Sequence, residues 1–428
     1  MLANLPLHTG LRHAVVIASL LLAACTSVSP YRTELAKTCD LTAISAGTAP
    51  PECGLAAIET SKDFDIAYVE FSDQGWLYSR DQLATALKLL HKPDPRPLQI
   101  IVFVHGWKHS ARFEDTDVRA FRETVMPAMA RNQPNSRTVG VFVGWRGASL
   151  DLPSVPQSIS FYDRKSTADH VARGAVRELF SNLRVMRNRT LPGPAPRPSI
   201  TLIGHSFGGL ILYNSIAESL LDTLVVANAG DPSTPRLARP VFDLVVLLNP
   251  AFEATRFEPL FQVAKDRLAT GGVPWLYAQN QRPVFVSITS EADSATKTAF
   301  PIGRFINSTF QHEGWTDQDD RSKQDYGERL EKIANTHTIG HMARYRTHRL
   351  SLSPNTQPSL KTGTKFGIDC TALPNPLLAN DKRFPLWNLF AAADVSDGHH
   401  DLSRENLWDF ISALGKSEPG PDPDPICR

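Results

Sequence analysis

Continuous apolar runs of four to seven residues recur along the chain, each bounded by residues that favour turns. Because these runs are continuous rather than alternating, they favour strands that are covered on both faces. They predict strands over Ile66–Phe71, Leu98–Val104, Val139–Trp145, Ile200–Ile203, Phe242–Leu248, Val284–Thr289 and Leu389–Ala393.

Segments with helical spacing of apolar residues lie between several of these strands and after the last one. They cover Ser166–Arg187, Gly208–Ser219, Glu253–Leu268 and Arg404–Leu414. Strands that alternate with helices predict an α/β fold with a mostly parallel central sheet and helices on both faces. Ligands of such sheets bind at the carboxyl ends of the strands, so candidate chemistry is expected there.

Two stretches of the chain are polar, contain aromatic residues and show no regular spacing of apolar residues. Residues 147–165 and 301–349 are interpreted as lid-like insertions above the sheet. Residues 26–61 are rich in Ser, Thr, Pro and Ala and predict a tether, and residues 416–428 predict a C-terminal tail. The main domain is therefore expected over residues 62–415.

Composition and charge narrow the class of protein. A chain of 428 residues with 42% hydrophobic residues can bury a sizeable core. The formal net charge is only +1, whereas proteins that bind nucleic acids usually carry a basic excess or stripe. We therefore expect no nucleic-acid partner, and the sequence does not indicate an oligomeric state.

The N-terminus predicts export. Arg12 precedes an apolar run over residues 14–24, which is shorter than the roughly 20 residues that span a bilayer and suits a signal peptide. The run ends in LAAC at residues 22–25, which resembles the lipobox of bacterial lipoproteins. That resemblance implies a signal peptide over residues 1–25, a lipid on Cys25 and a membrane-anchored chain. Thr26 loosely resembles the sorting pattern for an outer-membrane position facing the periplasm, whereas an ordinary secretory signal is the alternative.

Four cysteines remain beside Cys25, namely Cys39, Cys53, Cys370 and Cys427. An even number in an oxidising compartment is what two disulfides require. Four cysteines allow three connectivities, and short loop closure favours the pairs Cys39–Cys53 and Cys370–Cys427.

Residues 199–209 read SITLIGHSFGG, a predicted strand, a serine flanked by glycines, and the start of a predicted helix. This context is typical of a nucleophile elbow, in which the serine occupies a strained turn and glycines allow close backbone packing. The segment GHSFGG resembles the elbow of esterases and lipases of the α/β-hydrolase superfamily. The resemblance covers about residues 66–410 and implies the α/β-hydrolase fold, with Ser206 as the nucleophile.

The resemblance also assigns an oxyanion hole. The strand IIVFV at residues 100–104 runs into His105 and Gly106, like the family strand whose following loop donates a backbone N–H. The amides of Trp107 and Phe207 are then the expected donors, each worth about 3 to 4 kcal/mol of transition-state stabilisation. We interpret His105 as structural.

The family order of serine, carboxylate and histidine directs the search for the other two catalytic groups. Asp293 follows the predicted strand 284–289 at a distance that suits the acid loop, with Glu291 and Glu253 as alternative acids. The segment DGHHD at residues 397–401 follows the last predicted strand. His399, directly after a glycine as in the family, is the expected base, and His400 is the alternative.

These residues favour a serine hydrolase that acts on carboxylic esters, including lipid esters, through an acyl-enzyme. Amides or thioesters would use the same groups. A protein of another class, a non-catalytic envelope lipoprotein with this fold that binds lipid, glycan or protein, remains the alternative. No cofactor is expected. The pair His337 and His341 lacks the glutamate of zinc metalloproteases, so no metal site is expected either.

Overall fold

The computed structural model describes residues 29–147, 157–188, 197–228, 237–269, 277–278, 281–301, 330–353, 367–374 and 383–415. Cys25, Cys427 and the tail lie outside the described residues, as do residues 148–156 and 302–329 of the two predicted insertions.

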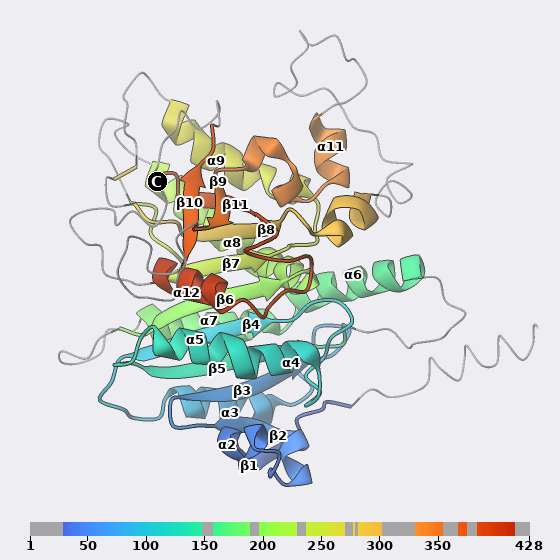
Figure 1. Cartoon of the computed structure of the whole chain (residues 1–428), viewed down its shortest axis with the longest axis vertical. Helices are drawn as coiled ribbons and strands as arrows, with labels where there is room; N and C mark the ends of the chain where they lie inside the picture. The colour runs from blue at the N-terminus through green and yellow to red at the C-terminus, as the bar shows by residue number, and fades with distance from the viewer. Residues whose placement is uncertain are drawn as a thin grey trace, which may run out of the picture.

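A single sheet of eleven strands runs through this part of the chain, in the order β1-β2-β3-β5-β4-β6-β7-β8-β11-β9-β10 (Figure 1). Adjacent strands from β3 to β9 are parallel, whereas β2 pairs antiparallel with β3, and β10 with β9. The strands are β1 (Glu34–Asp40), β2 (Ala56–Thr60), β3 (Phe64–Phe71), β4 (Leu98–Val104), β5 (Arg137–Trp145), β6 (Ser199–His205), β7 (Leu244–Leu248), β8 (Phe285–Ser290), β9 (His348–Leu352), β10 (Ile368–Ala372) and β11 (Leu386–Ala391). The predicted, mostly parallel sheet is confirmed, and all seven predicted strands are present within a few residues.

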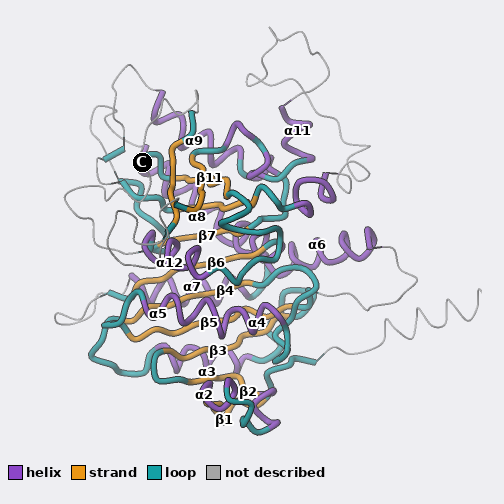
Figure 2. The backbone as a smooth tube through the Cα atoms, viewed as in Figure 1, coloured by secondary structure: helices purple, strands orange, loops and turns teal. Residues whose placement is uncertain are grey.

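Helices cover both faces of the sheet, as Figure 2 shows. One face carries α3 (Arg80–Leu90), α6 (Gln157–Arg173), α7 (Val176–Asn188), α8 (Phe207–Asn228), α9 (Glu258–Ala269) and α11 (Leu330–Thr336). The other carries α4 (Thr116–Ala120), α5 (Met126–Arg131) and α12 (Glu405–Leu414), with a π-helical turn over Phe121–Val125 between α4 and α5. A separate apolar core fills each side. The helix α8 is long and apolar enough to cross a membrane, but it packs on β6, α6 and α9 within the first of these cores.

The helix predicted over Ser166–Arg187 is two helices, α6 and α7, and α6 begins inside the first predicted insertion. The break has a steric cause. Gly174 lies against the backbone of Gly75, where an added Cβ would be 2.2 Å from the carbonyl oxygen. The Ala175 amide then donates to that same carbonyl at 2.7 Å, so the helical hydrogen-bond ladder is interrupted at this point.

The second predicted insertion is also partly wrong. Residues 302–329 lie outside the described residues, but the rest of the segment forms α11 and two short 3-10 turns, and its end enters the sheet as β9. The short strands β9 and β10 carry no long apolar run, which is why the hydrophobic pattern did not predict them.

The prediction of a tether over residues 26–61 is wrong for its described part. This segment supplies β1 and β2 at the edge of the sheet, and the short helix α2 (Leu41–Ser45). The predicted disulfide Cys39–Cys53 closes it, and both cysteines are buried. Cys370 is also disulfide-bonded, and its predicted partner Cys427 lies outside the described residues.

A buried charge cluster fastens this N-terminal segment to the rest of the domain. The Glu59 carboxylate receives two hydrogen bonds from Arg122, at 2.8 and 2.9 Å, and one from Arg32 at 3.1 Å. Tyr68 donates a further hydrogen bond to Glu59 at 3.0 Å. Since these residues are almost completely buried, each charge depends on its partners for the solvation that water would otherwise provide.

We expect Glu59→Ala to lower the free energy of unfolding by about 3 to 5 kcal/mol, because it leaves two buried guanidinium groups without their carboxylate. Denaturant unfolding followed by tryptophan fluorescence measures this. The control Glu52→Ala removes an exposed carboxylate from the same segment and should change stability by less than about 0.5 kcal/mol. Equal stability of the two variants would contradict the prediction.

Candidate active site

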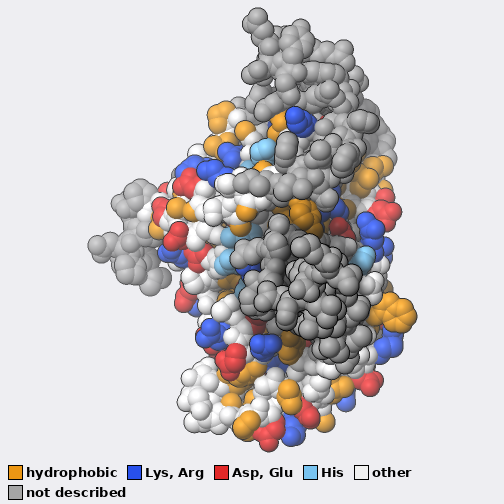
Figure 3. Space-filling model, turned by 90° about the vertical axis from the view of Figure 1, so that its right-hand side faces the viewer, with side chains coloured by type: hydrophobic (Ala, Val, Ile, Leu, Met, Phe, Trp, Pro, Cys, Tyr) orange, Lys and Arg blue, Asp and Glu red, His pale blue; other side chains and the backbone are white. Residues whose placement is uncertain are grey.

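The sheet changes its direction of winding between β4 and β6. The chain leaves β4 toward β5 on one side and leaves β6 toward β7 on the other. Open parallel sheets bind ligands at the carboxyl ends of the strands at such a point. The loops that follow these strands lie at the right in Figure 1, the side that Figure 3 turns toward the viewer. Histidine side chains are visible on that face.

Ser206 occupies a strained turn between β6 and α8. Its φ of +55° lies in the left-handed region, which residues other than glycine rarely adopt. Its amide donates to the Leu248 carbonyl at 2.9 Å, which holds the turn against β7. A Cβ added at Gly208 would lie only 2.0 Å from the Val104 carbonyl oxygen. A side chain is therefore excluded at Gly208, as the predicted elbow requires.

A chain of hydrogen bonds joins Ser206 to two residues that are distant in the sequence. The Ser206 hydroxyl lies 2.8 Å from Nε2 of His399, and Nδ1 of His399 lies 2.9 Å from Oδ2 of Asp293. Asp293 is fully buried and also accepts hydrogen bonds from the amide and the hydroxyl of Thr296. The structure thus brings together the three residues that the sequence suggested.

The electrostatic surroundings set the charge of each group. Burial alone raises the pKa of Asp293, but hydrogen bonds and charge from His399, together with the Thr296 donors, lower it below its ordinary value. Burial lowers the pKa of His399, and the hydrogen bond to Asp293 offsets this only in part. At neutral pH the arrangement is therefore a carboxylate, a neutral imidazole and a hydroxyl, in which Nε2 can accept the serine proton.

The alternative acids and base lie elsewhere in the site region. Glu291 pairs with Arg349 at 2.8 Å, and buried Glu253 pairs with Lys165 at 2.9 Å. His400 is exposed, and its ring lies against those of His399, His205 and His109, with no hydrogen bond to Ser206 among the described contacts. None of the three belongs to the hydrogen-bonded chain through Ser206.

The two predicted oxyanion donors flank Ser206. Phe207 follows it at the start of α8, and Trp107 follows Gly106 in the loop after β4. A Cβ added at Gly106 would lie 2.9 Å from Cβ of Ser206, so only glycine lets this loop approach the serine so closely. Among the described residues, neither the Trp107 amide nor the Phe207 amide has a hydrogen-bond acceptor. Both N–H groups are therefore available to a ligand oxygen.

Aromatic rings line one side of the same region. Phe161 on α6 lies 5.5 Å from Trp107 and 4.9 Å from Phe207, measured between ring centroids, and 6.1 Å from Phe300. We call these four residues the aromatic wall. It gives the surroundings of the two free amides an apolar character.

His105 has the structural role that was expected of it. It is fully buried, its ring stacks on Trp145 at 5.5 Å, and its Nε2 accepts the Trp145 amide proton at 3.0 Å. Burial lowers the pKa of His105 to about 4, so the ring is neutral and can accept this hydrogen bond at neutral pH.

Among the described residues, His109, Asp115 and Asp117 form a group whose ligand atoms lie within 4.8 Å of one another and could hold a metal ion. Hydrogen bonds already stabilise this group. Asp115 accepts the amide protons of Ser110 and Asp117, each at 2.9 Å, and lies 3.0 Å from Nδ1 of His109. Its position as the N-cap of α4 accounts for the hydrogen bond from the Asp117 amide.

Sequence reasoning missed the residues that support this site. Thr296 binds Asp293 and lies 2.9 Å from Nε2 of His341, a histidine that was considered only as a metal ligand. His205 and Asn249 hold backbone carbonyls of the loop that carries His399, and Asp117 lies 3.5 Å from the His205 ring. Of these supporting residues, only His205 lies inside a motif that the sequence analysis identified, namely the elbow GHSFGG.

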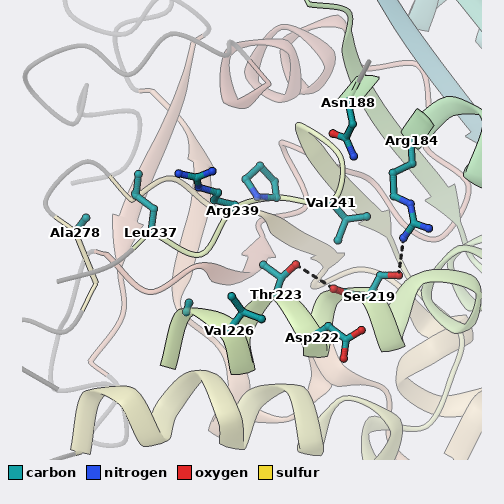
Figure 4. A pocket seen from close by; sticks show the side chains of 12 residues that line it. Arg184, Asn188, Ser219, Asp222, Thr223, Val226, Leu237, Arg239, Val241 and Ala278 are labelled. Carbon is teal, nitrogen blue, oxygen red and sulfur yellow. Dashed lines mark hydrogen bonds between the residues drawn. The ribbon is translucent and has the colours of Figure 1, made fainter. Parts of the chain in front are cut away.

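A pocket of about 710 Å³ lies between α7, α8 and the segment before β7 (Figure 4). It is lined by the later part of α8, including Ser219, Thr223 and Val226, and by Arg184 of α7. Ser219 is twelve residues beyond the first residue of α8, which corresponds to about 18 Å along the helix axis. This pocket is therefore separate from the site around Ser206.

Comparison with known proteins agrees with the architecture. A family model described as the alpha/beta hydrolase family matches residues 101–351, more than half of the chain. That range contains Ser206 and Asp293 but ends before His399. No curated protein matches the sequence.

We expect Asp293→Asn to lower the pKa of His399 further, because the hydrogen bond and negative charge of Asp293 favour the protonated ring. A pH titration of histidine-labelled protein by NMR measures this, and a His399→Gln sample identifies the resonance among the 13 histidines. The control Asp169→Asn removes a carboxylate that pairs with Arg256 instead. An unchanged or raised His399 pKa in Asp293→Asn would contradict the prediction.

Proposed function

Since the chain belongs to the alpha/beta hydrolase family, whose members are generally hydrolytic, we propose that it is a serine hydrolase acting on carboxylic esters. The observation that carries this proposal is the continuous hydrogen-bonded chain from Ser206 through His399 to Asp293. A structural serine would need neither the strained turn nor a buried histidine with its own carboxylate.

The proposed reaction begins at the Ser206 hydroxyl. Its oxygen attacks the acyl carbon while its proton moves to Nε2 of His399, and Asp293 holds the opposite ring nitrogen and stabilises the imidazolium. The carbonyl oxygen becomes negatively charged and receives hydrogen bonds from the amides of Trp107 and Phe207. The acyl–oxygen bond then breaks, His399 gives its proton to the leaving alcohol, and an acyl-enzyme remains on Ser206.

A water molecule completes the cycle by the same steps. The oxygen of the water attacks the acyl carbon of the acyl-enzyme while His399 takes a proton from that water. The bond between the acyl carbon and Ser206 then breaks, His399 returns the proton to the Ser206 oxygen, and the carboxylic acid leaves. The products are thus one alcohol and one acid, and the side chains return to their starting protonation states. No further group is required by this scheme.

The aromatic wall supports an ester with an apolar acyl or alcohol portion. Phe161, Trp107 and Phe207 pack against one another beside the nucleophile, and burying apolar ligand surface there gains about 25 cal/mol per Å². Lipid esters and small apolar esters share this chemistry. The same catalytic groups could also cleave thioesters or amides.

We further propose that the protein is exported and anchored to the bacterial envelope by a lipid on Cys25, at the outer membrane facing the periplasm. The disulfide between Cys39 and Cys53 supports export, because such bonds persist in oxidising compartments. Metabolic labelling with a fatty-acid analogue, compared between the parent and Cys25→Ala, tests the anchor.

Fluorophosphonate probes, which react with activated serines, test the catalytic proposal. Protein lacking residues 1–25 should be labelled, and Ser206→Ala and His399→Ala should each abolish labelling, because one removes the nucleophile and the other its base. The neighbouring variant His400→Ala is the matched control and should keep the parent's labelling. A folded parent that is not labelled would contradict the proposal and favour a binding lipoprotein.

The pH dependence of ester hydrolysis gives a second test. His399 must be neutral to accept the serine proton, and burial lowers its pKa below the ordinary 6.5. The rate should therefore stay high on acidification through pH 6.5 and fall only at a lower midpoint. Initial rates between pH 4 and 8, with fluorescence confirming the folded state at each pH, measure this midpoint. A midpoint above 6.5 would contradict the proposed environment of His399.

A further inference from the structure

The backbone carbonyl of His399 is held by two side chains from neighbouring strands. Nε2 of His205, at the end of β6, lies 2.7 Å from the His399 carbonyl oxygen, and Nδ2 of Asn249, just after β7, lies 3.0 Å from the same oxygen. Because a carbonyl only accepts, His205 must carry its proton on Nε2 and donate it. Asn249 also donates to the Gly398 carbonyl at 3.0 Å.

This anchor acts directly after a sharp turn of the chain. Gly398 has a φ of +93°, a conformation that favours glycine, so the chain turns sharply immediately before His399. The His399 ring must nevertheless keep Nε2 within 2.8 Å of the Ser206 hydroxyl. A fixed carbonyl at residue 399 restricts the rotation of the backbone from which that ring projects.

The other side of the His205 ring faces the loop after β4. Nδ1 lies 3.5 Å from Oδ2 of Asp117, a buried carboxylate on α4. The same carboxylate oxygen accepts the Gly106 amide proton at 3.4 Å. Asp117 therefore lies beside both the loop that presents the Trp107 amide and the His205 ring, but it makes no hydrogen bond to that ring.

We propose that His205 is a positioning residue, which anchors the His399 loop through the Nε2–H bond to the His399 carbonyl. This inference rests on the proposed hydrolase function, within which His205 touches no reacting atom. It explains why the side chain inside the elbow motif is a fully buried histidine rather than an apolar residue, although burying a polar ring is costly.

The test compares two replacements of His205 in the full chain. His205→Gln keeps an amide donor near the position of Nε2, whereas His205→Leu fills a similar volume without a donor. The matched control is His348→Leu, the same change at another buried histidine, on β9. Thermal unfolding of all four proteins shows whether a loss of activity follows a loss of stability.

With a soluble 4-nitrophenyl ester, His205→Leu should lower kcat roughly 10²-fold and change KM less than about threefold, because a displaced base impairs the chemical step more than binding. His205→Gln should stay within about tenfold of the parent kcat, and His348→Leu should keep it. A purely structural role would not be rescued by glutamine. Equal losses in His205→Gln and His205→Leu, or a kcat for His205→Leu within twofold of the parent, would overturn the inference.

Hydrogen exchange measured by mass spectrometry tests the anchor without relying on activity. A peptide covering residues 394–404 should exchange at least about tenfold faster in His205→Leu than in the parent, His205→Gln or His348→Leu. Unchanged exchange in His205→Leu would overturn the inference. A parent that neither hydrolyses esters nor reacts with fluorophosphonate would instead refute the proposed function, and the exchange result would still decide the anchor.

Discussion

Close backbone packing between the loops after β4 and β6 is the constraint on which the site depends. Gly208 at the start of α8 lies against the carbonyl of Val104, and Gly106 lies against Cβ of Ser206. A single methyl group at either glycine would separate the two loops. That separation would move the Trp107 amide away from the serine. Ser206 itself adopts a positive φ so that its side chain leaves the turn toward these loops.

Buried charge is the second determinant, and the molecule uses it differently in two places. At the sheet edge, Glu59 is surrounded by Arg32 and Arg122, which fixes the N-terminal segment to the domain. Near the serine, Asp293 faces a histidine whose pKa burial keeps low, so its charge is balanced by hydrogen bonds rather than by a permanent cation. The first arrangement serves stability, whereas the second leaves a ring that can gain and lose a proton.

The sequence predicted the centre of the fold better than its edges. Strands β3 to β8 are covered on both faces, so their continuous apolar runs predicted them. The elbow glycines around Ser206 predicted the position of the nucleophile directly. The outer strands β1, β2, β9 and β10 carry no long apolar run. The segments of β1 and β2 therefore resembled a tether, and the start of β9 resembled the end of an insertion. The contacts of Thr296 and His205 with the proposed triad could not be predicted, because they join residues that only the folded sheet brings together.

The N-terminal segment packs on the domain, and this limits how far a lipid anchor could place the domain from the membrane. The amides of Tyr31 and Arg32 are already fixed by the Glu70 carboxylate, at 2.8 to 3.0 Å, so the folded domain begins there rather than at residue 62. Tyr31 lies six positions after Cys25, and a fully extended chain covers at most about 3.6 Å per residue. A lipid on Cys25 would therefore keep this edge of the sheet within about 22 Å of the membrane surface. Such an enzyme would work close to the bilayer, where esters with apolar portions are concentrated. Esters of this kind are the ones that the aromatic wall would favour.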